Sequence, residues 1–483
     1  MTAFSGRVTV PIATSMQRSG KPRGSVATPA ATSRWLGGAQ ILSLAVLGGA
    51  VAINDGRLHW QALHWLAMAV LALAGGMILC RGRITSLATP RMLHSAMLLI
   101  ITANLVHLAV GGTTNIGPMS VPRVAMLACL LTINIGLIFA LATRLRTLGV
   151  GLMIGGFGAA AWAMVWTAPH VRIDVLAFQR ESSAALLNGQ NPYHARYRNV
   201  YHPDTEFYGT GSTTPDGWLT YSFPYPPASL LLSLPGALAG DVRYSQAAAI
   251  CLAALLLVAA GRNQTAILAA GLLLTSPRLL HVVQMGWTEP LLIFLAAAVI
   301  YAAIRARWML WAAIGAFLAS KQYLVLAVPL LPLLRGARET SGRFWKTIVL
   351  AGVLAMAVTA PFVLMDPHAF VRSTVEWQLV QPFRYDALSF PAMIGQLGGA
   401  PSGGLLGFVA GGIAILLALW KAPRTAGGFF ASAALVFCCF FACNKQAFCN
   451  YYQLVIGLSC CAIVGLSVTP HNDTAARAGP IRG

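Results

Sequence analysis

Long apolar runs separated by short polar turns recur along most of the chain. Many of them approach about 20 residues, the length that an α-helix needs to cross a bilayer. The hydrocarbon core offers no water to a spanning backbone, so these runs are expected to be helices that satisfy their own hydrogen bonds. The alternation typical of an outer-membrane barrel is absent. The expected spans are residues 35–53, 60–80, 92–112, 121–143, 147–168, 242–261, 264–281, 287–304, 308–319, 322–335, 345–364, 403–420, 425–443 and 450–469.

This pattern predicts an all-α, polytopic integral membrane protein with about 12–14 transmembrane helices. Two of the runs, 308–319 and 322–335, are short and are also compatible with a hairpin that enters the membrane and returns. Composition agrees with this class, because 57% of the 483 residues are hydrophobic and only 10% are charged. A soluble domain carries roughly 25% charged residues.

The net charge of +20 invites a nucleic-acid interpretation, but its distribution argues against one. Residues 1–34 contain five basic residues and no acid, which predicts a disordered, basic cytoplasmic tail. This tail either binds anionic membrane lipids or serves only as a topology signal. We therefore expect membrane lipids, and no nucleic acid, as partners.

The positive-inside rule sets the orientation once this tail is placed in the cytoplasm. Acids are then almost absent from the inner turns and tails, which hold only Glu339 and Asp473. Residues 470–483 form a second cytoplasmic tail, and the predicted location is the inner cell membrane. The basic residues on the inner side are Arg81, Arg83, Arg91, Arg144, Arg146, Arg262, Arg305, Arg307, Arg335, Arg338, Arg343, Lys346, Lys421, Arg424, Arg477 and Arg482.

Two long segments fall on the outer side in this orientation. Residues 169–225 form the main extracytoplasmic loop, and residues 366–402 form a second outer segment. The second segment mixes aromatic and charged residues, as does a helix that lies in the membrane interface. The apolar stretch 226–240 is too short to span and is predicted to be re-entrant or interfacial.

Several polar motifs lie at the outer ends of the predicted spans. Arg172-Ile-Asp174 directly follows a span, and Leu186-x-x-Gly-x-x-Pro-Tyr193 and Tyr221-Ser-Phe-Pro-Tyr-Pro-Pro227 follow it in the main loop. Three further outer turns are Gln284-Met-Gly-Trp-Thr-Glu289, Ser320-Lys-Gln322 and Asn444-Lys-Gln-Ala-Phe-Cys-Asn-Tyr-Tyr452.

The order of these motifs resembles the membrane glycosyltransferases of the C-type superfold, and most closely the group that depends on polyprenyl-phosphate mannose. In the Gln284–Glu289 turn, Gly and Gln depart from that group's usual order. The resemblance covers residues 147–469, which it identifies as a glycosyltransferase core. Four further helices within residues 35–146 precede this core, and no role is assigned to them.

The resemblance implies an inverting glycosyltransferase that uses a polyprenyl-phosphate sugar, with mannose or a pentose as the sugar and a lipid or glycan as the acceptor. Asp174 is its expected catalytic base, and desolvation at the membrane boundary should raise the pKa of this carboxyl. Fixed cations should stabilise the departing phosphate. The expected substrate-binding residues are Arg172, Lys321, Gln322, Tyr193, Tyr225, Gln284, Glu289, Lys445, Asn450 and Tyr451.

Several of these residues also have a purely structural interpretation. In it, Asp174 is the ion-pair partner of Arg172, Lys321 reaches the interface from a hairpin tip, and Glu289 favours a helix N-terminus. The same interpretation makes the tyrosines and Asn450 interfacial anchors.

A transporter or flippase of a lipid-linked substrate is the competing function, although such proteins place functional charge near the midplane. No cofactor is predicted beyond the donor substrate, and no metal site is assigned. Dependence on a divalent metal stays open. The nine cysteines have no metal-binding or haem-binding spacing, and most lie within apolar runs, so they are interpreted as packing residues.

Overall fold

A computed structural model of the protein describes residues 29–80, 89–110, 121–201, 207–209, 211–336, 339–400 and 404–468. The predicted C-terminal tail, nearly all of the N-terminal tail, the turn with Arg81 and Arg83, and Arg338 lie outside these residues. The loop acids Asp204 and Glu206 lie outside them as well.

Within the described part of the chain, the regular structure is helical, and β-structure is confined to isolated bridges such as Thr213 to Leu219. The first half contains α1 (Pro29–Ala52), η1 (Ile53–Gly56), α2 (Trp60–Leu79), α3 (Pro90–Val110), α4 (Val121–Leu141), η2 (Thr143–Leu145), α5 (Arg146–Thr167), α6 (Asp174–Leu187), η3 (Pro192–His194), α7 (Pro227–Leu238) and α8 (Arg243–Gly261). The second half contains α9 (Gln264–Leu274), α10 (Leu279–Gln284), α11 (Glu289–Arg305), η4 (Arg307–Met309), α12 (Leu310–Leu318), η5 (Gln322–Leu334), α13 (Ser341–Met365), α14 (Pro367–Val371), η6 (Arg372–Glu376), α15 (Trp377–Val380), α16 (Phe390–Gln396), α17 (Leu405–Lys421), α18 (Ala426–Ala442) and α19 (Cys449–Ser467).

Eight helices among the described residues are long and apolar enough to cross a membrane, which makes the chain a multi-pass membrane protein by length and composition. They are Arg34–Gly56, Trp60–Leu79, Pro90–Val110, Arg123–Leu141, Thr143–Thr167, Arg243–Gly261, Ser341–Met365 and Cys449–Ser467. The all-helical prediction is confirmed. Several other expected spans are helices too short for this criterion.

The expected span 264–281 is not one helix but two, α9 and α10. α9 ends at Leu274, Pro277 follows, and Arg278 adopts a left-handed φ of 66° before α10 begins. α9 does not have to match the thickness of a bilayer, because every one of its residues from Ala266 onward is buried by other helices.

The segment 322–335 forms a 13-residue 3-10 helix, η5, which contains Pro329 and Pro332. A 3-10 helix rises about 2.0 Å per residue, so η5 extends over roughly 26 Å despite its short sequence. The stretch 226–240 forms the short helix α7, which begins at Pro227.

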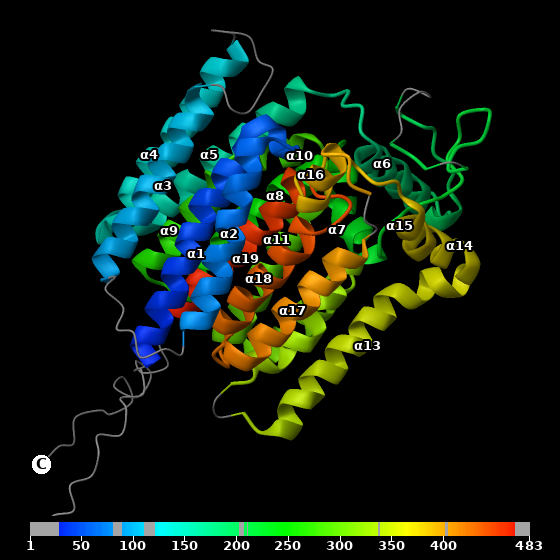
Figure 1. Ribbon diagram of the computed structural model, residues 1–483. Helices are drawn as coiled ribbons and strands as arrows, with labels where there is room; N and C mark the ends of the chain where they lie inside the picture. Colours follow the sequence, from blue (N-terminus) through cyan, green and yellow to red (C-terminus); the bar gives the residue numbers. More distant parts are fainter. Residues whose placement is uncertain are drawn as a thin grey trace, which may run out of the picture.

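The helices differ strongly in how much of their surface is buried. α18 and α19 lie in the centre of the bundle, and nearly all of their residues are buried (Figure 1). α13 stands at the edge, packs mainly against α12, and buries only Phe344, Ala351 and Phe362. An apolar helix with so little protein contact has a surface suited to lipid.

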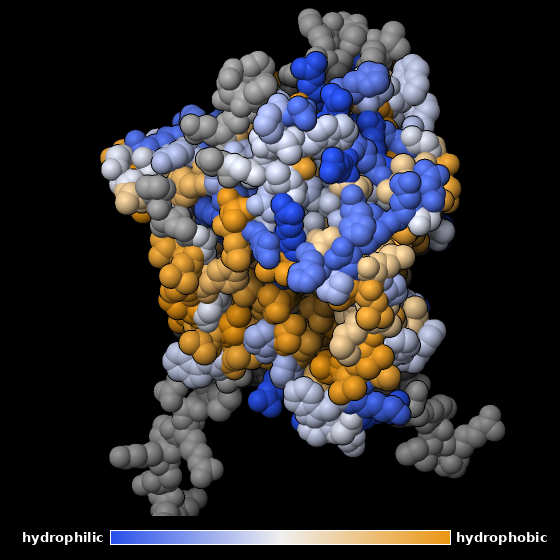
Figure 2. All heavy atoms as spheres, turned by 90° about the vertical axis from the view of Figure 1, so that its right-hand side faces the viewer, coloured by the Kyte–Doolittle hydropathy of each residue, from blue (hydrophilic) through white to orange (hydrophobic). Residues whose placement is uncertain are grey.

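The two predicted outer segments pack together at one end of the molecule, where α6, α14 and α15 lie (Figure 1). The backbone N–H of Ser222 donates to Ser373 Oγ at 3.1 Å, and His194 Nε2 lies 2.6 Å from Asp366 Oδ2. A separate small hydrophobic core fills this part and includes Phe178, Tyr193, Tyr197, Phe223 and Trp377. Figure 2 shows polar residues gathered over this end and hydrophobic residues directly below them.

Candidate functional site

A cavity of about 1130 Å³ lies between the outer segments and the ends of the central helices. Among the residues that line it are Asp174, Lys321, Lys445 and Tyr451, so four regions that are far apart in sequence meet around one space. Eight of the eleven predicted site residues line this cavity: Arg172, Asp174, Tyr225, Lys321, Gln322, Lys445, Asn450 and Tyr451.

Asp174 is the first residue of α6 and has well-defined hydrogen-bond partners. Its Oδ1 accepts from the Val175 N–H at 2.8 Å and from Tyr201 Oη at 3.0 Å, and its Oδ2 accepts from Tyr208 Oη at 3.3 Å. Arg172 forms no ion pair with Asp174 among the described residues, so the helix-end pairing with Arg172 is wrong.

Burial raises the pKa of the Asp174 carboxyl above its usual value, and the hydrogen bonds from Tyr201, Val175 and Tyr208 oppose this rise only in part. The direction is the one expected from its position at the membrane boundary. Burial and the nearby Asp174 carboxylate raise the pKa of the Tyr201 and Tyr208 hydroxyls, so both remain hydrogen-bond donors. The result is a carboxylate held in one orientation at a cavity wall.

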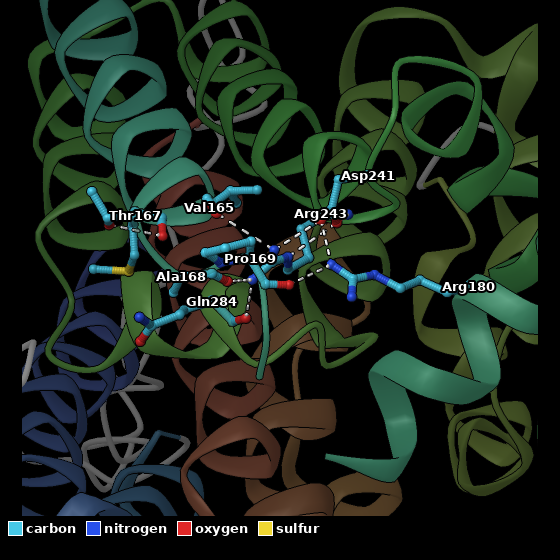
Figure 3. A network of polar contacts seen from close by, with 9 residues as sticks. Val165, Thr167, Ala168, Pro169, Arg180, Asp241, Arg243 and Gln284 are labelled. Atoms are coloured by element: carbon cyan, nitrogen blue, oxygen red, sulfur yellow. Dashed lines mark hydrogen bonds and ion pairs between the residues drawn. The ribbon is translucent and has the colours of Figure 1, made fainter. Parts of the chain in front are cut away.

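The chain that leads into Asp174 is fixed by a fully buried arginine at the start of α8 (Figure 3). Arg243 Nη1 donates to the carbonyls of Ala168 at 2.8 Å and Gln284 at 3.0 Å. Arg243 Nη2 and Arg180 Nη2 both bind Asp241 Oδ2, at 2.8 and 2.5 Å. One guanidinium therefore ties the segment after α5 to the last residue of α10.

This network explains the position of Gln284, whose carbonyl is bound by Arg243 and which does not line the cavity. Tyr193 also lies outside the cavity lining. It is 1% exposed, and its hydroxyl donates to the Tyr225 carbonyl at 2.7 Å, so it supports the Tyr-Pro-Pro turn from behind.

Lys321 is buried and paired. Its Nζ lies 2.6 Å from Glu289 Oε1 and donates to Thr288 Oγ1 at 2.8 Å. Glu289 is fully buried at the start of α11, and its Oε1 also accepts from Tyr323 Oη at 3.1 Å. Lys321 is 5% exposed, so it does not extend to the interface as a snorkelling lysine would.

Aromatic rings surround the same ammonium group. Lys321 Nζ lies 4.8 Å from the ring centroid of Tyr225, 5.5 Å from that of Tyr323 and 5.7 Å from that of Tyr451. These distances fall within the range of cation–π attraction. Burial raises the pKa of the Tyr225 hydroxyl, and the Asp174 and Glu289 carboxylates add to this effect.

Gln322 and Lys445 hold the second outer segment. Gln322 Nε2 donates to the carbonyls of Pro224 at 2.5 Å and Thr374 at 2.9 Å. Lys445 Nζ donates to the carbonyls of Leu379 at 3.2 Å and Gln381 at 2.7 Å. Both side chains therefore position backbone around the cavity as well as lining it.

Several cavity residues were missed from the sequence. Tyr201, Tyr208 and Arg384 come from loop stretches without a recognisable motif, and Asp55 and Arg57 come from the turn between α1 and α2. A cluster of aromatic residues over 201–208 was the one available signal for the first two. The turn between the first two of the four helices within 35–146 thus contributes to the cavity, although the sequence assigned these helices no role.

Within the described residues, no group of three or more His, Cys, Asp or Glu side chains is arranged to hold a metal ion. The comparisons with known proteins give no identification either: no family model, curated protein or solved structure matches this chain.

Proposed function

We propose that this protein is an inverting glycosyltransferase that moves a sugar from a polyprenyl-phosphate carrier to a lipid or glycan acceptor at the extracytoplasmic face. The observation that carries the proposal is the placement of Asp174. Its carboxylate lies in a large cavity, with a raised pKa and with Lys321 and Arg384 lining the same space. A base and fixed cations within one cavity suit transfer from a phosphate leaving group.

The reaction requires one proton transfer and one displacement. The acceptor hydroxyl gives its proton to Asp174 while its oxygen bonds to the anomeric carbon of the sugar. The bond from that carbon to the phosphate oxygen breaks, and the polyprenyl phosphate leaves with the electron pair. Tyr201 and Tyr208 orient the carboxylate, and the remaining N–H of Lys321 is available to the phosphate.

The apolar end of the cavity supports a lipid-linked donor. Val325 of η5, Leu379 of α15 and Phe408 of α17 line it and are 60%, 74% and 52% exposed. Exposed apolar side chains that continue a polar cavity toward the hydrocarbon give a lipid chain a place to lie. A donor with a charged head and a long apolar tail matches both ends of the cavity.

The decisive experiment is transfer by purified protein in lipid, with radiolabelled polyprenyl-phosphate sugars and membrane acceptors, for the wild type and Asp174→Asn. Loss of the base should lower kcat by roughly 10²–10⁴-fold. Because Asp174 must be ionised to act, the wild-type kcat/KM should fall as pH drops through a value above the ordinary carboxyl pKa of about 3.9.

Asp216→Asn is the matched control, since Asp216 is an exposed carboxylate of the same loop and lies outside the cavity lining. Its activity should equal that of the wild type. Full transfer by Asp174→Asn would remove Asp174 as the base. Absence of transfer from every donor, together with intact movement of a lipid-linked substrate across vesicles, would favour the transporter instead.

A further inference from the structure

The turn between α1 and α2 reaches the cavity in an unusual backbone conformation. Asn54, Asp55 and Gly56 have φ values of 50°, 57° and 69°, three consecutive residues in the left-handed region. Residues other than glycine are rare there, and the conformation persists where the surroundings impose it. The next residue, Arg57, is exposed and lines the cavity together with Asp55.

Three separate elements hold this turn in place. A Cβ on Gly56 would lie 2.5 Å from the Cβ of Cys449, so the turn sits directly on the start of α19. The N–H of Leu58 donates to the Asp386 carbonyl at 2.8 Å in the second outer segment. Arg278, which precedes α10, forms an ion pair with Asp55. These contacts fix the backbone next to Arg57, so the position of this residue at the cavity is set by the fold.

The charges around the cavity exceed what one donor phosphate requires. Five cationic side chains and two carboxylates line it in the described part of the chain: Arg57, Arg172, Lys321, Arg384 and Lys445 against Asp55 and Asp174. When the ion-pair partners Arg278, Glu289 and Asp386 are included, six cations stand against four carboxylates, a surplus of two positive charges. A phosphodiester carries a single negative charge, so it neutralises only one of the two.

Most of these cations already have partners. Lys321 pairs with Glu289, Arg384 pairs with Asp386, and Lys445 donates to two backbone carbonyls. The guanidinium groups of Arg57 and Arg172 form no hydrogen bond or ion pair with any residue that the structure describes. Among the cations that line the cavity, Arg57 and Arg172 are therefore the two whose side chains have no protein partner in the described part of the chain.

We propose that Arg57 and Arg172 form a second anion-binding subsite, which takes a phosphate or carboxylate group of the acceptor. This rests on the proposed function, because it divides the cavity between donor and acceptor. Guanidinium groups suit the assignment, since their planar fork binds phosphate and carboxylate through two parallel hydrogen bonds. The first two helices then serve to complete the acceptor end of the site.

The first test is direct binding to the purified protein in detergent, with inorganic phosphate and short-chain phosphatidic acid as probes and short-chain phosphatidylcholine as the neutral comparison. Arg57→Gln should weaken binding of the anionic probe by roughly tenfold, the effect of one lost charge-assisted hydrogen bond. Arg57→Lys should restore part of it. Arg196→Gln, at an exposed arginine outside the cavity lining, should bind as the wild type does.

The outcomes separate this proposal from the proposed function. Binding of phosphatidic acid alone assigns the anion to a lipid headgroup, and binding of both probes assigns it to a phosphate in general. The subsite is overturned if Arg57→Gln and the wild type bind the anion equally well. It is also overturned if the folded wild type binds no anion. Both conclusions hold whether or not the protein transfers sugar. Anion binding that depends on Arg57 without any sugar transfer would retain the subsite and reject the transferase.

Separate KM values for acceptor and donor distinguish a binding role of Arg57 from a purely structural one. With membrane acceptors separated by anion exchange, the wild type should modify the anionic fraction. Arg57→Gln should raise KM for that fraction and leave KM for the donor unchanged. A rise in the donor KM instead would assign Arg57 to the donor phosphate and overturn the proposal.

Discussion

At the scale of single residues, the Lys321–Glu289 pair shows how a charge is kept inside an apolar bundle. The Lys321 ammonium is 2.6 Å from Glu289 Oε1 and lies against three tyrosine rings, so its burial is offset by one opposite charge and by ring faces. Glu289 Oε2 has no partner in the described part of the chain. One carboxylate oxygen is thus committed to Lys321 and Tyr323, and the other is buried without a hydrogen bond from the described residues.

Breaking this pair on one side should destabilise the fold strongly. Glu289→Gln leaves the buried Lys321 ammonium without its counter-charge, and we expect a loss of about 3–5 kcal/mol in the free energy of unfolding. The double variant Lys321→Met/Glu289→Leu should recover most of this loss, because neither charge then remains buried. Denaturant unfolding in detergent measures both effects.

Glu339→Gln supplies the comparison, since Glu339 pairs with the partly exposed Arg307. Solvent screens that pair, so we expect a smaller loss, on the order of 1 kcal/mol. Equal losses in Glu289→Gln and Glu339→Gln would contradict the view that burial makes the Lys321 pair sensitive.

The sequence located many cavity residues but not their partners. Lys321 and Asp174 were predictable because each follows an apolar helix in an outer turn, a position that is visible in the hydropathy pattern. The partner of Lys321 lies 32 residues away, and Tyr208 lies 34 residues from Asp174, so both contacts depend on tertiary packing. Arg57 was missed for the same reason, since the approach of its turn to α19 leaves no local pattern.

At the scale of elements, the presence of helices was predictable, but their lengths and the 3-10 form of η5 were not. The hydropathy pattern places helices at 242–261 and 450–469, where α8 and α19 occur. It joins α9 and α10 into one span, because Thr275 and Ser276 interrupt the apolar run only weakly. Length predictions assume that a helix must span the bilayer, which takes about 20 residues. A helix buried among other helices is not bound by this requirement, so its length cannot be predicted in this way.

The α1–α2 turn is the element whose geometry is most demanding, and Gly56 is its central residue. Gly56→Ala puts a Cβ 2.5 Å from Cys449 and places alanine at a φ of 69°. We expect a loss of about 1–3 kcal/mol in the free energy of unfolding. The shift should appear in the thermal unfolding midpoint.

Gly75→Ala in α2 is the matched control, since a Cβ there meets nothing within 4 Å. Alanine is the better helix former by about 1 kcal/mol, so this variant should be as stable as the wild type or more stable. If Gly56→Ala were equally harmless, the turn would not be held against α19 as tightly as its contacts indicate.

At the scale of the whole molecule, hydrophilic residues gather at the end formed by α6, α14 and α15, and hydrophobic residues lie below them on the face that Figure 2 shows. The cavity lies at this end, and exposed apolar side chains of η5, α15 and α17 are part of its lining. If the basic turns face the cytoplasm, the cavity faces outward, where lipid-linked sugars rather than nucleotide sugars serve as donors. The orientation therefore decides which donor the site can meet.

Single cysteines in a variant without the nine native cysteines test this orientation. Asp216→Cys replaces an exposed residue of the main outer loop, and Arg424→Cys replaces an exposed residue in the turn between α17 and α18. Because lysine and arginine are retained on the cytoplasmic side, a membrane-impermeant maleimide should label residue 216 in intact cells and residue 424 only after permeabilisation. The opposite pattern would turn the cavity toward the cytoplasm, where nucleotide sugars become available as donors and the case for a polyprenyl-phosphate donor loses its topological support.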